Sequence, residues 1–134
     1  MAMPSREAHC CCGQLRLTCE GDPVRIAICH CIDCQRRTGN VFGVTARFPR
    51  AQVTKIEGRS TAFRRVADSG NGITFHFCPD CGTTVYWEPA RFPDTIAVAV
   101  GAFADPGSPA PRHSVYERRR HPWVDTSIAP EHLD

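Results

Sequence analysis

The spacing of the cysteines constrains this chain more than any other feature of its sequence. Nine cysteines occur in 134 residues, and all but one of them fall into three tight groups. The groups are Cys10, Cys11 and Cys12; Cys29, Cys31 and Cys34; and Cys78 and Cys81, with Cys19 alone. Separations of one or two residues are typical of thiols that bind one metal ion. The grouping therefore predicts metal sites.

Disulfide bonds are the competing explanation for so many cysteines. An odd number leaves at least one thiol unpaired. The N-terminal stretch MAMPSREAHC carries an arginine and a glutamate where a secretory signal needs an uninterrupted apolar run. The longest apolar run, residues 96–104, is too short to cross a bilayer. We therefore expect a cytoplasmic protein with reduced thiols and no membrane partner.

The first and last groups together predict one closed metal site. Cys78 and Cys81 form a C-x2-C knuckle, and Gly82 follows them, free to take the left-handed conformation that such knuckles use. Cys10 and Cys12 supply a second pair, although the spacing leaves open which two of the three neighbouring cysteines bind. Four thiolates complete a structural zinc site that joins distant segments. The alternative is that these cysteines are buried apolar side chains without a metal.

The middle group is one ligand short of a closed site. Cys29, Cys31 and Cys34 have the spacing C-x-C-x2-C. Three protein ligands with one open position are typical of a catalytic zinc, which keeps a place for water or substrate. A fourth protein ligand would make the site structural, and the candidates are His9, His30, His76, Cys11 and Cys19. His30 is the least suited, because it stands between two ligands and is expected to point away from an ion that both hold.

Two arginine clusters are candidate binding groups. Arg36 and Arg37 follow the middle group, where three thiolates on one zinc ion leave a net charge of about −1. They could offset this charge or bind a substrate carboxylate, or one could form a salt bridge and the other stay solvated. Residues 118–120 are also arginines, but so short a run is typical of a solvated edge. Seven thiolates on two zinc ions would shift the formal charge from +2 to about −1, so we expect no nucleic-acid partner.

Short alternating segments predict a mostly β fold with little helix. Apolar and polar residues alternate with the period of two that half-buried strands show. The predicted strands cover residues 14–20, 24–28, 41–48, 52–56, 61–66, 73–77, 83–87, 95–100 and 114–117. One helical turn is predicted after the middle cysteine group, capped by Asp33 and stopped by Gly39. The length of 134 residues predicts a single domain.

Three motifs together resemble the glutathione-dependent formaldehyde-activating family, which includes centromere protein V. They are C-x-C-G, CHCIDCQRRTG and FCPDCGT, and the tail segments Pro111-Arg112-His113 and His121-Pro122-Trp123 are also similar to that family. The resemblance covers about residues 9–125 of a single zinc-binding domain spanning 1–134. It implies a β-tent of several small coiled antiparallel sheets stapled by zinc. It also assigns Cys10, Cys12, Cys78 and Cys81 to a structural zinc, and Cys29, Cys31 and Cys34 to a second, catalytic-type zinc.

The resemblance also implies a chemistry. It points to a zinc-dependent carbon-sulfur lyase that forms or cleaves S-hydroxymethylglutathione or a related thiol adduct. The cofactors would be two Zn²⁺ ions per chain, and the partners a small thiol such as glutathione and a small carbonyl. The alternative, from another class, is a non-catalytic zinc-stabilised binding or scaffold module. A closed second zinc site would be the sign of that alternative.

Overall fold

Two β-sheets and one short α-helix dominate the part of the chain that the structure describes. The computed structural model describes residues 4–67 and 69–134. One sheet has the strand order β1-β2-β5, and the other has the order β11-β10-β3-β4-β9-β8-β7-β6. The strands are β1 (Ser5–His9), β2 (Arg16–Glu20), β3 (Arg25–Cys29), β4 (Gly43–Pro49), β5 (Val53–Glu57), β6 (Thr61–Val66), β7 (Gly72–Phe77), β8 (Thr84–Pro89), β9 (Thr95–Ala99), β10 (His113–Val115) and β11 (Glu131–His132). The expectation of a mostly β fold is confirmed.

Each predicted strand segment contains a strand, with its ends displaced by at most two residues. The strands β1 and β11 were not expected. Only Ala8 is fully buried in β1, and both residues of β11 are exposed, so neither segment shows an apolar alternation. β1 forms because its backbone pairs with β2, where Ala8 lies opposite Leu17. Pairing of this kind leaves no signal in the sequence of the paired segment.

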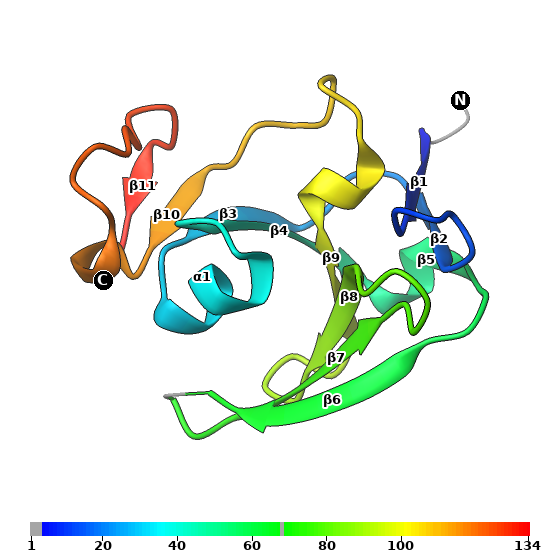
Figure 1. The fold of residues 1–134 in the computed structure, drawn as a ribbon. Coiled ribbons are helices and arrows are strands. Elements are labelled where there is room, and N and C mark those ends of the chain that lie inside the picture. The colour runs from blue at the N-terminus through cyan, green and yellow to red at the C-terminus, as the bar shows by residue number, and fades with distance from the viewer. Residues whose placement is uncertain (1–3, 68) are drawn as a thin grey trace.

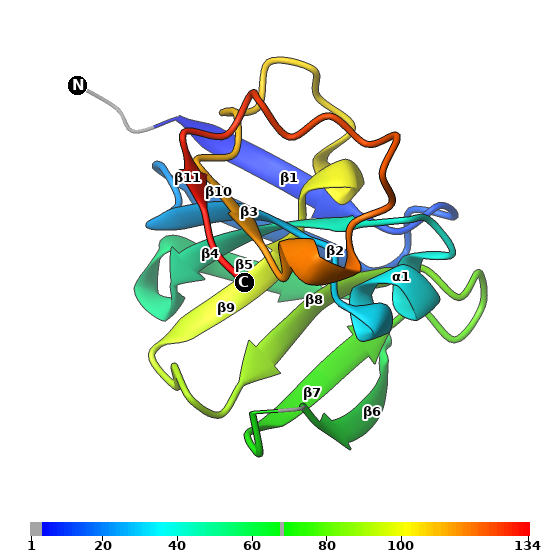
Figure 2. The ribbon, with the colours of Figure 1, turned by 90° about the vertical axis from the view of Figure 1, so that its left-hand side faces the viewer.

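The C-terminal strands join the larger sheet in parallel. β10 pairs in parallel with β3, and β11 pairs in parallel with β10. The other pairings described are antiparallel, as the family resemblance implied. A parallel pair needs a long crossover, and here six strands lie between β3 and β10 in the chain. Figure 2 shows β11 and β10 beside β3 at this edge.

The larger sheet curves around the helix α1 (Ile32–Thr38), while the smaller sheet lies away from that concave side (Figure 1). On β4, Ala46 and Phe48 are buried in the main core with Leu17 of β2. Thr45 and Arg47 alternate with them and line a cavity. The period of two along β4 thus separates the core from the cavity. Within the described ranges, no helix is long and apolar enough to cross a membrane.

The helix α1 begins one position after Cys31, and the prediction that Asp33 caps it is wrong. The Sγ atom of Cys31 accepts a hydrogen bond from the backbone N–H of Cys34 at 3.3 Å, which makes Cys31 the N-cap residue. Asp33 lies in the first turn and forms an ion pair with Arg65 of β6. Gly39 ends the helix with a φ of 70°, as predicted.

Candidate functional site

Four cysteines from two distant turns meet at one point. Cys10 and Cys12 lie between β1 and β2, and Cys78 and Cys81 lie between β7 and β8. Their sulfur atoms all lie within 4.8 Å of one another, with separations of 3.6 Å for Cys10 and Cys12 and 3.7 Å for Cys12 and Cys78. At a Zn–S distance of about 2.3 Å, tetrahedral sulfurs are about 3.8 Å apart. The cluster therefore fits a zinc ion, and Cys11 is not part of it.

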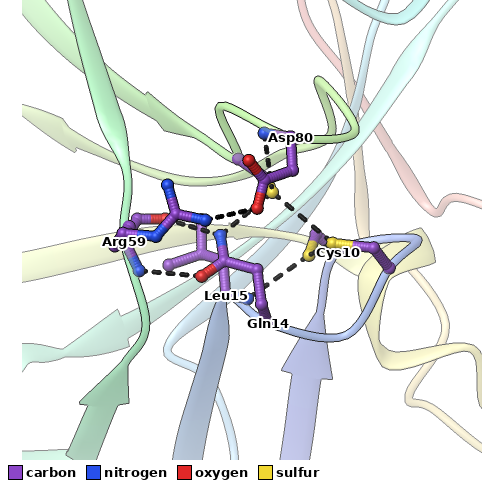
Figure 3. Close-up of polar contacts among 7 residues, drawn as sticks. Cys10, Gln14, Leu15, Arg59 and Asp80 are labelled. Carbon is purple, nitrogen blue, oxygen red and sulfur yellow. Dashed lines mark hydrogen bonds and ion pairs between the residues drawn. The ribbon is translucent and has the colours of Figure 1, made fainter.

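Hydrogen-bond donors surround two sulfur atoms of this first cluster, those of Cys10 and Cys78 (Figure 3). The Gln14 side chain donates from Nε2 to the Sγ of Cys78 at 3.0 Å and to the carbonyl of Arg59 at 2.8 Å. The backbone N–H of Leu15 donates to the Sγ of Cys10 at 3.3 Å. Burial raises the pKa of Cys78, but the hydrogen bonds, that of Gln14 foremost, outweigh it and leave the pKa below its usual value. Such bonds orient metal ligands and stabilise their charge.

The knuckle after β7 supplies a second thiol with a lowered pKa. The Thr83 hydroxyl lies 3.4 Å from the Sγ of Cys81, and this hydrogen bond is the main reason why the pKa of Cys81 falls to about 5. Gly82 has a φ of 81°, the left-handed conformation expected for it. A thiol with this pKa is ionised at neutral pH, which is the form that binds metals.

The middle cysteines form a second cluster of three. Cys29 ends β3, Cys31 caps α1 and Cys34 lies in its first turn, so the tight turn into the helix brings their sulfur atoms within 4.8 Å of one another. No other histidine, cysteine, aspartate or glutamate of residues 4–67 and 69–134 joins this group. The cluster therefore has the three-thiol composition that the sequence predicted.

Each candidate for a fourth ligand is placed elsewhere. His30 is fully buried, and its Nε2 lies 2.9 Å from the Ser114 hydroxyl. His76 lies 2.7 Å from the Glu88 carboxylate, and His9 lies 2.7 Å from the carbonyl of Cys10. Cys19 is buried in the main core, and Cys11 is exposed.

The three thiols of the second cluster compete for protons. Hydrogen bonds from Cys29 and Cys34 lower the pKa of Cys31 to about 2. The hydrogen bonds that Cys29 makes with Cys31 and Cys34, together with its burial, raise the pKa of Cys29 far above its usual value. One thiolate thus suppresses ionisation of its neighbours. A divalent cation at the centre removes this conflict, because it stabilises all three thiolates at once. The donor set therefore fits a zinc ion.

The second cluster lies in the wall of a cavity of about 240 Å³ inside the curve of the larger sheet. Arg37 lines this cavity, with its guanidinium carbon 4.2 Å from the ring centroid of Trp87 and 5.8 Å from that of Phe75. Its Nη2 atom lies 4.0 Å from the Sγ of Cys34. This position suits a cation that offsets the charge of the thiolates. Arg36 is exposed and lines an adjoining groove instead.

Three further arginines line the cavity and were not among the predicted site residues. They are Arg25, Arg47 and Arg65. Arg25 shares a strand face with Cys29, so the alternation along the predicted strand was a signal for it. Arg47 reaches the cavity because it lies opposite Arg25 across β3 and β4, a register that the sequence does not display.

The arginine run before the C-terminal segment does not form a continuous basic surface. Arg118 and Arg119 are exposed, whereas Arg120 is half-buried. Arg120 donates to the carbonyl of Val124 at 2.7 Å and lies 3.7 Å from the Glu117 carboxylate. Its role is to hold the loop that follows, which leaves two exposed cations in the run.

Comparison with known proteins places this site in a family. A family model described as glutathione-dependent formaldehyde-activating enzyme matches residues 5–119, a range that includes both cysteine clusters. The chain belongs to this family. A Fusarium vanettenii protein, provisionally named a glutathione-dependent formaldehyde-activating enzyme, is 26% identical over 83 residues. That match covers 55% of this chain and 44% of the relative, so the chain matches less than half of the relative's length.

A solved structure agrees on the fold. The crystal structure of a Rhodobacter sphaeroides protein superposes with a TM-score of 0.58 and covers 96% of this chain and 99% of that one. The two sequences are 15% identical, so this likeness concerns the fold alone.

Proposed function

We propose that this protein is a zinc-dependent carbon-sulfur lyase that forms or cleaves S-hydroxymethylglutathione or a related thiol adduct. The observation that carries the proposal is the second cluster, in which three thiols within 4.8 Å of one another line a cavity and no fourth protein ligand among the described residues joins them. Family membership supports the choice of glutathione and formaldehyde as the substrate pair. We infer a cytoplasmic location, because metal binding by these cysteines needs reduced thiols and the cytosol keeps thiols reduced.

Two zinc ions with different roles follow from the two clusters. Cys10, Cys12, Cys78 and Cys81 would hold a structural ion, and Cys29, Cys31 and Cys34 would hold the second. A zinc ion with three protein thiolates is a Lewis acid that lowers the pKa of a thiol entering its fourth position.

The residues around the second cluster would position the thiol substrate. Arg37 is fixed against Trp87 and lies beside Cys34, where its charge offsets the excess negative charge of the thiolates. Phe75 and Trp87 exclude water from this wall of the cavity. In the synthetic direction the substrate sulfur bonds to the formaldehyde carbon, and the carbonyl π pair moves to its oxygen. That oxygen takes up the proton that the thiol releases, so the sum is one hemithioacetal with no net change in protons. Holding both reactants in one cavity is the main contribution of the chain.

The non-catalytic alternative is less well supported. A binding or scaffold module needs only structural metal sites, and these are closed by protein ligands. The three thiols of the second cluster line a cavity, and no fourth protein ligand among the described residues joins them. We therefore favour the enzyme.

Exchange spectroscopy by NMR tests the proposal on an equilibrated mixture of glutathione and formaldehyde. Because the hemithioacetal also forms without a catalyst, the informative quantity is the ratio of exchange rates with and without protein. We expect wild-type protein to accelerate exchange and the Cys31→Ser variant to have no effect. The matched control is Cys11→Ser, which removes an exposed thiol outside both clusters and should retain the acceleration. Equal exchange rates with wild type, Cys31→Ser and buffer would rule out this substrate pair.

A further inference from the structure

Two arginines lie together in the cavity, and neither has a carboxylate partner among the described residues. Arg25 of β3 and Arg47 of β4 are directly opposite each other in the antiparallel register, and both line the cavity that contains the three thiols. Neither forms an ion pair with an acidic side chain in the part of the chain that the structure describes. Like charges directly opposite each other destabilise a sheet. The pair therefore destabilises the sheet, which suggests that the two arginines are kept for a function.

The surroundings of Arg47 increase this cost. Its guanidinium carbon lies 4.1 Å from the ring centroid of Phe92, and its Nε atom is buried with no hydrogen-bond partner in residues 4–67 and 69–134. Burial, followed by the charges of Arg25 and Arg91, lowers the pKa of Arg47. A bound anion would relieve both the repulsion and the desolvation, because a carboxylate accepts two parallel hydrogen bonds from one guanidinium.

The other charged groups of the cavity do not compensate the pair. Among the described lining residues Asp33 is the one carboxylate, and it forms an ion pair with Arg65. Arg37 lies at the thiol end, against Trp87 and Cys34. The described lining residues therefore give the cavity a surplus of positive charge.

The strand register separates the arginine pair from the thiols. Arg25 and Cys29 lie on the same face of β3, four residues apart, which corresponds to about 13 Å of strand. Ala27 lies between them, and Thr45 occupies the opposite position on β4. These small side chains line the cavity between its two ends. The cavity thus has the three thiols toward one end and the Arg25 and Arg47 pair toward the other.

We propose that Arg25 and Arg47 form an anion-binding subsite that selects thiols whose carboxylate is remote from the sulfur atom. The assumption that the substrate sulfur binds beside the three thiols rests on the proposed function. A tripeptide thiol such as glutathione carries two carboxylates, each several bonds from its sulfur, and can span the two ends. In free cysteine the carboxylate is close to the sulfur, so the amino acid cannot reach the subsite while its thiol is at the cluster.

A thiol-free ligand tests the subsite separately from the reaction. S-methylglutathione keeps both carboxylates but has no thiol to ionise or to react. We expect Arg25→Gln and Arg47→Gln each to weaken its binding, measured by calorimetric titration of the zinc-loaded protein, by about 10- to 100-fold, the range for one charge-assisted contact. The matched control is Arg118→Gln, which removes the same charge from an exposed position outside the cavity and should leave the affinity unchanged. Circular dichroism and zinc content show whether each variant is folded. If Arg47→Gln does not fold, the binding measurement on Arg25→Gln alone tests the subsite.

The outcomes separate this inference from the proposed lyase. Unchanged affinity in the Arg25→Gln variant, or no binding of S-methylglutathione to wild type at millimolar concentration, would overturn the subsite. Accelerated glutathione-formaldehyde exchange that survives Arg25→Gln with the same dependence on glutathione concentration would also overturn it, while leaving the lyase intact. Arginine-dependent binding without any acceleration of exchange would support the subsite and rule out glutathione and formaldehyde as the substrate pair of the lyase. If Arg25→Gln still accelerates exchange but no longer prefers glutathione to cysteine, the result would support both the subsite and the lyase.

Discussion

The two cysteine clusters should contribute unequally to stability, because they close loops of very different length. Cys12 and Cys78 touch across 66 positions of the chain, and their cluster joins the turn between β1 and β2 to the turn between β7 and β8. Cross-linking a loop of that length lowers the entropy of the unfolded chain by an amount worth about 4 kcal/mol at 25 °C. The second cluster lies within one stretch from Cys29 to Cys34, for which the same relation yields about 2 kcal/mol.

The matched pair of changes is Cys78→Ser and Cys31→Ser. Cys78 is fully buried, and its loss should release the first ion together with the long-range link. Cys31→Ser should release the second ion but preserve the start of α1, because serine is itself a preferred N-cap residue. At about 4 °C per kcal/mol for a chain of this size, we expect the melting temperature to fall by roughly 15 °C for Cys78→Ser and by roughly 8 °C for Cys31→Ser.

Thermal unfolding followed by circular dichroism, with zinc measured by elemental analysis, tests this reasoning. Wild type and the control Cys11→Ser should each contain two zinc ions and melt together. Each cluster variant should contain one ion. Equal losses of melting temperature in the two cluster variants would refute the argument from loop length. Two ions in Cys78→Ser would refute the ligand assignment itself.

Further measurements test the surroundings of the site. We expect neither the wild type nor a variant with residues 118–120 changed to serine to bind a DNA or RNA probe. A salt-sensitive, submicromolar gel shift with the wild type that is lost in this variant would contradict this expectation. Native zinc-loaded protein should be alkylated by iodoacetamide at exposed Cys11 and not at Cys19, which is fully buried and whose pKa is raised by burial to about 11; mass spectrometry reads the sites. Burial raises the pKa of Glu88, but hydrogen bonds, that of Arg50 foremost, outweigh it and hold the pKa below 4.5. The charged carboxylate therefore stabilises the protein above pH 4.5, and this contribution is lost as the pH falls through the lowered pKa. Urea unfolding should show Glu88→Gln less stable than wild type at pH 7, with a difference that shrinks below pH 4.5.

The sequence by itself was sufficient for features that depend on residues close together in the chain. The spacing from Cys29 to Cys34 is short enough that one turn into a helix brings the three thiols together, so the cluster could be predicted from spacing alone. Alternation located most strands, because a half-buried strand shows its two faces directly in its sequence. The end of α1 at Gly39 followed from the same local logic.

Other features depended on which strands pair and how the sheet curves. The cap of α1 proved to be Cys31 rather than Asp33, because the helix starts where the thiols converge and Asp33 is engaged by Arg65 from a distant strand. Strand β1 forms through backbone pairing, which does not depend on the identity of its side chains.

The cavity itself was decided by the tertiary structure. The register between β3 and β4 sets Arg25 opposite Arg47, and the curve of the larger sheet brings Trp87 of β8 against Arg37 and the thiols beside it. A period of two tells which residues share a face of one strand, but not which strand lies beside it. Cysteine spacing therefore determined where metals can bind, and strand register with sheet curvature decided which charges surround the second of these sites.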